Sequence, residues 1–197
     1  GDIRVFGCDV VKQPFEVQKM INRVPVEASF FKKLSPMENL LYGAYFSGMS
    51  GRETRFRAEE ILLGLGLKKH AINKTMDEMS RGMQQKVAIA RALLSCPRLL
   101  LMDEPTAGLD PCSKKEVHEA IEEINHDSGT TILLTTRDTL EADNLCDRIA
   151  IMDSGRIVAL DTPARLKRMI SPNGHELTLE EVFREMTRKN LLKAEIG

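Results

Sequence analysis

The spacing of hydrophobic residues along the 197-residue chain changes near residue 97. Residues 36–96 carry the apolar spacing of helices, interrupted at SGMSGRE and at GLGLKKH. After residue 97, short apolar runs alternate with amphipathic segments, which is typical of strands that alternate with helices. The pattern therefore predicts an α/β fold with a parallel sheet.

The first 35 residues are the least regular part of the chain and contain only short strand-like pieces, IRVFG and NRVPVEASFF. Helix starts are clearer, because a capping residue is followed three positions later by an acidic residue. These pairs are Ser35 with Glu38, Ser113 with Glu116, Asp138 with Glu141 and Thr178 with Glu181. Gly129 is expected to end a helix, and residues 153–155 are expected to turn a β-hairpin.

Two apolar runs, RLLLM and TTILLTT, predict buried strands of that sheet. The first delivers Asp103 and Glu104 to its C-terminal end, where sites in α/β folds collect. One carboxylate there can hold Mg²⁺ and the other can polarise an attacking water. A solvated turn before Pro105 is the alternative interpretation. The second run ends at Arg137, a permanent cation in an equally prominent position.

A helix start upstream of these strands is a second candidate site. The run MSRGMQQKVAIARALL places Ser80 at the N-cap, and Gly82 in the first turn allows a ligand to approach the backbone. Free N–H groups, a hydroxyl and the neighbouring Arg81 make this helix N-terminus a natural phosphate site. A plain helix cap is the alternative interpretation.

Charge and cysteine content exclude several classes of protein. With 28 basic and 29 acidic residues, the net charge of −1 gives no whole-chain case for binding nucleic acid or an anionic membrane. The four cysteines contain no C-x-x-C pair, which argues against a disulfide framework or a zinc site. No apolar run approaches the ~20 residues of a membrane span, and no signal peptide is visible. These features predict a cytosolic protein.

The motifs occur in an order that resembles the ATP-binding domain of ABC transporters. MSRGM is similar to the signature motif of that family, with Arg in place of one Gly. RLLLMDEP resembles its Walker B segment and AGLD its D-loop, and LCDRIAIMDSGRIVALDTP extends the likeness downstream. LTLEEVFREM resembles the C-terminal end of the ATPases that serve ABC-2 type exporters. The resemblance implies a P-loop NTPase-like parallel sheet core with an inserted helical subdomain and a C-terminal β-hairpin and helix.

The same resemblance implies how the chain is divided. Residues 1–197 would form one incomplete ATP-binding domain. Residues 36–96 would be the helical subdomain with the signature motif, and residues 97–160 the sheet core with Walker B, D-loop and switch region. Residues 161–197 would be a C-terminal helical extension.

ATP and Mg²⁺ are the cofactors that the resemblance implies. Asp103 would serve Mg²⁺, and Glu104 would be the general base. In this family the domain pairs head to tail with a second copy, as a homodimer or a heterodimer. Each ATP then lies between the Walker A loop of one copy and the signature motif of the other, and Asp110 would link the two sites. The signature residues that would lie at the γ-phosphate bound on the partner are Ser80, Arg81, Gly82 and Met83.

Three features depart from the family pattern. No G-x-x-x-x-G-K-[ST] phosphate loop occurs in the chain. In the family it lies upstream of the segment resembled by GDIRVFG, and the first residue here is Gly1, so we expect the chain to lack the start of its domain. The Q-loop glutamine aligns with Val26, which cannot coordinate Mg²⁺. The switch histidine aligns with Arg137, which can contact a γ-phosphate but cannot relay a proton.

Arg137 has an alternative interpretation, which is an ion pair with Asp138 or Glu141. The histidines of the chain lie elsewhere in sequence and are interpreted as surface or cap residues. They are His70, His118, His126 and His175.

The resemblance implies the ATP-hydrolysing subunit of an ABC exporter. Hydrolysis would drive export through a separate membrane permease, which would hold the domain at the inner face of the cell membrane. Residues 30–46, with their aromatic side chains, would lie near the permease or belong to the core. The alternative, prompted by Val26 and Arg137, is a degenerate, non-hydrolysing domain with a regulatory or structural role. DNA-repair ATPases fit poorly, because the ~80 residues before MSRGM show no sustained heptads, and no nucleic-acid partner is expected.

Overall fold

The computed structural model of the chain describes residues 1–170 and 177–195. It divides the chain into two compact units, residues 1–135 and residues 136–197, and each unit is described by itself. His175 and the other residues of 171–176 and 196–197 in the predicted C-terminal extension lie outside the described residues.

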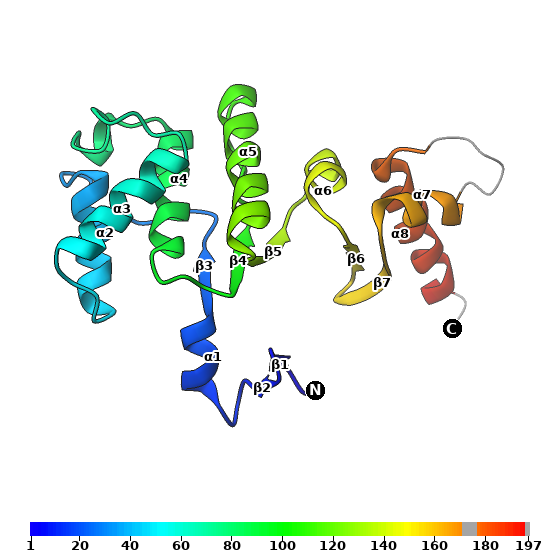
Figure 1. Ribbon diagram of the computed structural model, residues 1–197. Coiled ribbons are helices and arrows are strands. Elements are labelled where there is room, and N and C mark those ends of the chain that lie inside the picture. The colour runs from blue at the N-terminus through cyan, green and yellow to red at the C-terminus, as the bar shows by residue number, and fades with distance from the viewer. Residues whose placement is uncertain (171–176, 196–197) are drawn as a thin grey trace. The chain divides into compact units, whose positions relative to one another are not determined.

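The first unit is built on a three-stranded parallel sheet (Figure 1). Its strands, in spatial order, are β3 (Ile21–Val24), β4 (Leu99–Asp103) and β5 (Thr131–Thr135). Val24 lies opposite Met102, and Asp103 lies opposite Thr135, so all three strands end at one edge of the sheet. The predicted parallel sheet is confirmed, and this edge carries the predicted carboxylates.

Helices make up most of the rest of the first unit. They are α2 (Pro36–Phe46), α3 (Arg52–Gly64), the 3₁₀ helix η1 (Met76–Glu78), α4 (Arg81–Leu93) and α5 (Pro111–Ser128). Helix α2 packs on α3 and α4, α3 packs on α4, and α4 also packs on α5 and β3. Leu40, Leu62, Ile89, Leu100 and Val117 are fully buried in this unit. The predicted helical region with its two interruptions is confirmed.

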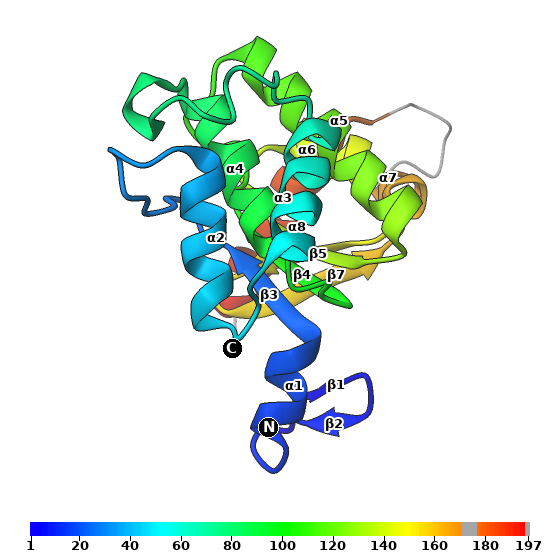
Figure 2. The ribbon, with the colours of Figure 1, turned by 60° about the vertical axis from the view of Figure 1, so that its left-hand side comes forward.

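The chain before β3 contains a helix that the sequence pattern did not predict. Strands β1 (Arg4–Val5) and β2 (Cys8–Asp9) form an antiparallel pair, and α1 (Pro14–Met20) follows them. Figure 2 shows these elements beyond the N-terminal end of β3, away from α2 to α4. Helix α1 buries only Val17, so the apolar stripe that reveals a helix in a sequence is missing.

The start of α5 corrects the predicted capping pair of Ser113 and Glu116. Asp110 is the N-cap, because its side chain accepts hydrogen bonds from the first turn and Pro111 occupies the first helical position. Glu116 instead forms an ion pair with Lys86 of α4 at 2.9 Å. The helix therefore begins earlier than the sequence interpretation placed it, and it ends at Gly129 as predicted, with φ +62°.

Strand β5 is less buried than predicted for the TTILLTT run. Its residues alternate between exposed and half-buried, and Leu133 is 61% exposed. Among the described residues β5 pairs only with β4, so it is an edge strand of the sheet. Strand β4, in the middle, buries Leu100 and Met102, while Leu99 and Leu101 are half-buried. A strand at the edge lacks a neighbour whose side chains would cover it.

In the part that the structure describes, the second unit contains the predicted hairpin and three helices. Its elements are α6 (Thr139–Leu145), β6 (Ile149–Asp153), β7 (Arg156–Asp161), α7 (Pro163–Ile170) and α8 (Leu179–Glu195). Ser154 and Gly155 turn the antiparallel β6–β7 hairpin with left-handed backbones, as predicted from Asp153-Ser154-Gly155. A small core holds the unit together, made of Ala142, Ile151, Leu166, Leu179 and Val182.

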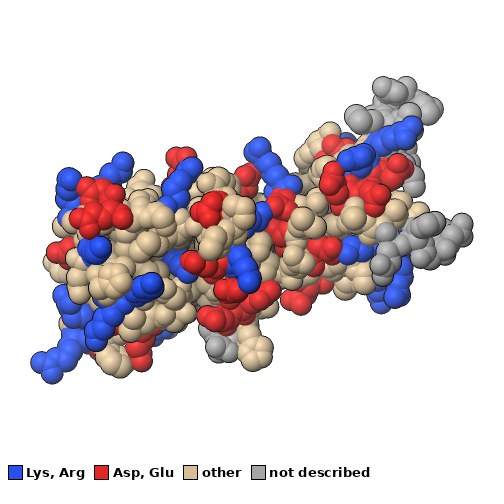
Figure 3. All heavy atoms as spheres, turned by 90° about the horizontal axis from the view of Figure 1, so that it is seen from above, with Lys and Arg blue, Asp and Glu red and all other residues tan. Residues whose placement is uncertain are grey.

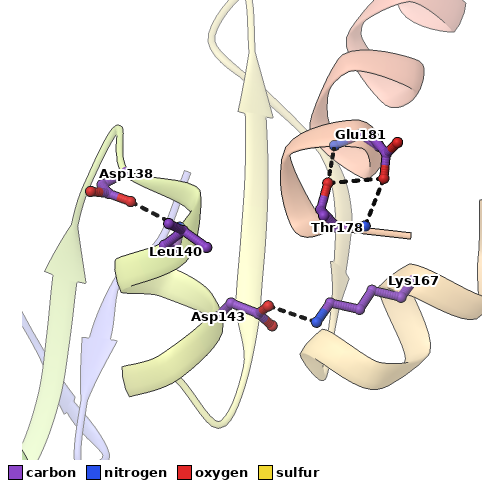
Figure 4. A network of polar contacts seen from close by, with 6 residues as sticks. All are labelled: Asp138, Leu140, Asp143, Lys167, Thr178 and Glu181. Carbon is purple, nitrogen blue, oxygen red and sulfur yellow. Dashed lines mark hydrogen bonds and ion pairs between the residues drawn. The ribbon is translucent and has the colours of Figure 1, made fainter. Parts of the chain in front are cut away.

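Polar contacts reinforce this second unit (Figure 4). Lys167 of α7 pairs with Asp143 of α6 at 2.6 Å. The predicted capping pair at α8 is confirmed, because Thr178 N–H donates to the Glu181 carboxylate at 2.8 Å and Glu181 N–H donates to the Thr178 hydroxyl at 3.3 Å. The reciprocal pair of Ser35 and Glu38 at α2 is confirmed in the same way.

Basic and acidic side chains are interspersed on the face that Figure 3 presents, in keeping with the near-neutral net charge. All four cysteines are free thiols, with Cys96 and Cys112 exposed and Cys8 and Cys146 half-buried. Within residues 1–170 and 177–195, no helix combines the length and apolar composition needed to cross a membrane.

Candidate functional site

The first cluster of predicted site residues lies at the C-terminal edge of the sheet. Asp103 ends β4 and is exposed, while Glu104 begins the loop to α5 and is half-buried. The Thr135 hydroxyl, at the end of β5, donates to Asp103 Oδ1 over 2.6 Å. The Glu104 N–H donates to Thr135 O at 3.0 Å and to Thr135 Oγ1 at 3.2 Å. One threonine therefore positions both acidic residues.

Thr135 is a site residue that was not predicted from the sequence. Its signal was present in the two threonines that end the TTILLTT run. A hydroxyl at the end of one parallel strand can donate to a carboxylate at the end of its neighbour. That contact depends on the pairing of β4 with β5, because the two residues are 32 positions apart.

Glu104 has a left-handed backbone, with φ +43°. Residues with a Cβ rarely adopt this conformation, which costs about 1–2 kcal/mol. It ends the strand alternation that would send Asp103 and Glu104 to opposite faces of the sheet. The Ala107 N–H donates to Glu104 O at 3.0 Å and, with the bonds to Thr135, holds this geometry. Strained residues held by their surroundings are frequent at functional sites.

The carboxylate cluster suits a partly hydrated Mg²⁺. Carboxylate oxygens are the ligands that Mg²⁺ prefers, usually one or two together with water and phosphate oxygens. Asp103 presents such oxygens at an exposed strand end. The described residues contain no group of three or more His, Cys, Asp or Glu side chains able to hold a metal ion. Phosphate and water would therefore supply most of the ligands.

The second cluster is the start of α4. The Ser80 hydroxyl caps the helix by accepting a hydrogen bond from Met83 N–H at 3.2 Å, as the cap interpretation predicts. Gln84 Nε2 donates to Met76 O at 3.0 Å and to Met79 O at 3.1 Å, which fixes the path of the preceding loop. The predicted contact of this segment with a phosphate stays a prediction.

Gly82 is buried against the neighbouring helix α5. A Cβ added at Gly82 would lie 2.6 Å from both Cβ and Oγ of Ser113. Real Cβ atoms essentially never approach so closely, so only glycine allows the two helix starts this spacing. The close approach is made by Ser113 of the same chain, whereas the sequence interpretation assigned it to a ligand.

Gly82→Ala is expected to lower the free energy of unfolding by up to about 2 kcal/mol. Overpacking costs about 1–3 kcal/mol, which exceeds the ~1 kcal/mol of helix propensity that alanine adds. Urea unfolding of the chain followed by circular dichroism measures the change. Ser113→Gly removes both clashing atoms, so adding Gly82→Ala to that variant should cost nothing further. If Gly82→Ala lowers the free energy of unfolding as much in the Ser113→Gly variant as in the wild type, the contact is contradicted.

Asp110 and the turn before it connect the two clusters. Asp110 Oδ1 accepts hydrogen bonds from the N–H groups of Cys112 and Ser113, both at 3.1 Å. Hydrogen bonds from Ser113, and then from Cys112, hold the pKa of Asp110 below its ordinary value. The Leu109 N–H donates to Thr106 O at 3.2 Å within the turn. Asp110 therefore has a capping role inside its own chain, and its proposed link to a second copy stays a prediction.

Val26 lies two residues beyond β3, at the same edge of the sheet as Asp103, and is exposed. An apolar side chain has no lone pair to offer a metal or a water. Val26 therefore lies at the edge of the sheet that carries the carboxylates, but its side chain can bind neither a metal nor a water.

Arg137 belongs to the second unit. It precedes Asp138, which caps α6 by accepting from Leu140 N–H at 2.9 Å (Figure 4) and from Glu141 N–H at 3.2 Å. Arg137 lines a groove between α6 and α8, together with the exposed apolar side chains of Leu140 and Phe183. The predicted contact with a phosphate and the predicted ion pair with Asp138 or Glu141 both stay predictions.

An aromatic patch on α2 and the loop before it corrects the core interpretation of residues 30–46. The patch is defined as Phe31, Tyr42, Tyr45 and Phe46, and all four side chains are exposed. Their rings contact one another edge to face, with centroids 4.7 to 5.8 Å apart. Phe30 differs, because it is half-buried beneath the guanidinium of Arg91 at 4.8 Å.

Comparison with known proteins extends these observations. Residues 1–107 match the family model described as ABC transporter. The chain is 38% identical, over all its 197 residues and 59% of the relative, to the daunorubicin/doxorubicin resistance ATP-binding protein DrrA of Streptomyces peucetius. It is 35% identical to the linearmycin resistance ATP-binding protein LnrL of Bacillus subtilis, over 84% of the chain and 53% of LnrL. The chain therefore spans between half and three fifths of these relatives.

Two solved structures share the fold. The ATP-binding subunit of an ABC transporter matches with a TM-score of 0.76 and 28% identity, over 95% of this chain and 76% of that one. A dimeric ATP-binding cassette in a post-hydrolysis state, bound to ADP and Pi, matches with a TM-score of 0.70 and 28% identity, over 82% and 73%. The predicted P-loop NTPase-like α/β fold class is confirmed.

Proposed function

The chain belongs to the ABC transporter family, and from that membership we propose that the complete protein is the ATP-hydrolysing subunit of an ABC exporter. The observation that carries the proposal is the pair of Asp103 and Glu104 at the end of β4, positioned by Thr135. Export, as the direction of transport, is supported by the two drug-resistance relatives. Phosphate release from Mg·ATP by the complete protein is the experiment that tests it.

The proposed reaction is hydrolysis of ATP to ADP and phosphate. Glu104 accepts the proton of the attacking water, a role that needs a carboxylate within hydrogen-bond reach of that water. Asp103 would hold Mg²⁺, which would neutralise negative charge on the phosphates. Catalysis of this kind depends mainly on positioning and electrostatics. The hydrogen bonds that Thr135 donates to Asp103 and accepts from Glu104 N–H position both residues.

A second ATP-binding domain is the first proposed partner, in a homodimer or a heterodimer. In that arrangement the start of α4 reaches the γ-phosphate held by the other copy, through Ser80, Gly82 and Met83. Asp110 lies at the same interface. The solved dimeric cassette with which this chain shares its fold supports this part of the proposal.

A membrane permease is the second proposed partner, and we place its contact on the aromatic patch of α2. Contiguous exposed apolar side chains are frequently protein interaction sites, and aromatic residues are enriched in interfaces. A groove lined by Gly43 and Arg91, among others, adjoins the patch. This contact would hold the protein on the cytoplasmic face of the membrane.

A degenerate, non-hydrolysing domain with a regulatory or structural role is the second candidate function. Val26 and Arg137 favour it, because both replace polar family residues that serve the nucleotide. The gene sequence upstream of this chain discriminates the two candidates. A G-x-x-x-x-G-K-[ST] loop there would count against a degenerate domain.

Arg137→His in the complete protein is expected to raise ATP turnover. Histidine exchanges a proton near neutral pH, whereas arginine keeps its charge. The increase should reach up to about 10²-fold, the lower end of what acid–base groups contribute. Phosphate release measures it, with Arg148→His, an exposed arginine of the same unit, as the control. An unchanged or lower rate would contradict the assignment of Arg137 to the switch position.

A further inference from the structure

We propose that Arg81 is a positioning residue that holds the D-loop, residues 107–110, against the start of α4 within one chain. The proposal rests on the neighbourhood of the Arg81 guanidinium and Gly108. Arg81 stands where the family places a glycine, so it is a feature of this chain that needs its own physical explanation.

The contact joins the Arg81 guanidinium to the backbone of Gly108. A Cβ added at Gly108 would lie 3.1 Å from Arg81 Nη1, 3.7 Å from Cζ and 3.9 Å from Nη2. The guanidinium therefore lies so close beside Gly108 that a side chain there would have to displace it by a few tenths of an ångström. Gly108 also has a left-handed backbone, with φ +69°. The left-handed backbone favours glycine there, and the neighbouring arginine leaves little room for a side chain.

The position of Arg81 on its helix makes a purely solvated role costly. Arg81 is the first residue of α4, where the helix dipole disfavours a positive charge. The first turn of α4 contains no acidic residue that would offset this positive charge. A local contact that uses the planar guanidinium explains why an arginine is accommodated at this position.

Three further contacts lie around this one and join α4, α5 and the end of the D-loop. Gly82 packs directly on Ser113. The side chain of Ser113 is hydrogen-bonded to Asp110. Lys86, whose side chain is only 7% exposed, pairs with Glu116 at 2.9 Å. These contacts join α4 to α5, and α5 to the end of the D-loop. Arg81 lies instead beside Gly108, in the middle of the D-loop.

The consequence for function rests on the proposed function. In a head-to-tail pair, the start of α4 and the D-loop of one chain both face the nucleotide of the other. If Arg81 holds them together, both reach that nucleotide as one body, and a change at either is transmitted to the other. Arg81 then acts through the D-loop backbone, without direct contact with a phosphate.

Hydrogen exchange of the 197-residue chain tests the contact without nucleotide. The reporters are the amides of Ala107 and Leu109, which are hydrogen-bonded inside the loop. Both Arg81→Ala and Arg81→Lys should speed their exchange about fivefold, the change expected when one contact is lost. Lysine keeps the charge but lacks the planar group. The matched control is Arg52→Ala, since Arg52 is the first residue of α3 and is exposed.

Unchanged exchange at Ala107 and Leu109 in Arg81→Ala, or an equal change in Arg52→Ala, would overturn the proposal. In the complete protein, both Arg81 variants should lower kcat about tenfold with an unchanged KM for ATP, as misplaced groups do. A raised KM in Arg81→Ala that Arg81→Lys restores would instead assign Arg81 to phosphate binding and overturn it. If wild-type protein hydrolyses no ATP, the proposed function fails, while the exchange experiment still decides the contact.

Discussion

Glu104→Gln should lower ATP turnover by the complete protein about 10²–10⁴-fold, which is the usual contribution of a general base. Glutamine keeps the size of the side chain but cannot accept a proton from water. The fold of the loop should survive, because the bonds that hold Glu104 use its backbone, from Glu104 N–H to Thr135 and from Ala107 N–H to Glu104 O. Steady-state phosphate release at saturating ATP measures the effect.

The matched control for this variant is Glu122→Gln on α5, because Glu122 is exposed and carries the same change of charge. That variant should keep wild-type turnover. Circular dichroism should give the same unfolding curve for Glu104→Gln as for the wild type, to within about 0.5 kcal/mol. Equal turnover in Glu104→Gln and the wild type would remove Glu104 from the reaction.

Asn39→Ala should lower the free energy of unfolding by about 3 kcal/mol, since three or more neutral hydrogen bonds are worth about 1 kcal/mol each. Asn39 is only 4% exposed. It accepts from Phe31 N–H at 2.9 Å and donates to the carbonyls of Phe31, Leu34 and Ser35 at 3.0 to 3.3 Å. It therefore fastens the segment between β3 and α2, which carries Phe31 of the aromatic patch.

Urea unfolding compares this variant with Asn144→Ala, which changes an exposed asparagine on α6. The control should stay within about 0.5 kcal/mol of the wild type. Asn39→Asp is a second test, because it keeps an acceptor for Phe31 N–H but loses the donors. A loss below about 1 kcal/mol in Asn39→Ala would mean that water replaces these bonds without cost.

Features that depend on neighbours in sequence were predictable. An apolar run that delivers Asp103 and Glu104 to a strand end specifies their place at the sheet edge, because parallel strands end together. Ser35, Ser80 and Thr178 cap helices with groups three residues away. The hairpin turn at residues 153–155 is equally local. Local patterns therefore predicted most helix starts, the hairpin turn and the position of the two carboxylates at the sheet edge.

Features that depend on packing between distant segments were not predictable. The bond from Thr135 to Asp103 requires the register of β5 with β4. The contacts of Arg81 and Gly82 with the D-loop and α5 join residues about 30 positions apart. Glu116 pairs with the buried Lys86 of α4, a partner 30 positions away that a local capping pattern does not reveal. No periodicity in the sequence encodes these partners.

The central claim is that this chain belongs to an ATP-hydrolysing subunit, and phosphate release from Mg·ATP by the complete protein tests it most directly. We predict a rate that saturates with ATP, requires Mg²⁺, falls in Glu104→Gln and persists in Glu122→Gln. If the complete protein binds ATP but releases no more phosphate than the Glu104→Gln variant, the claim is contradicted. The chain would then be assigned to a non-hydrolysing domain.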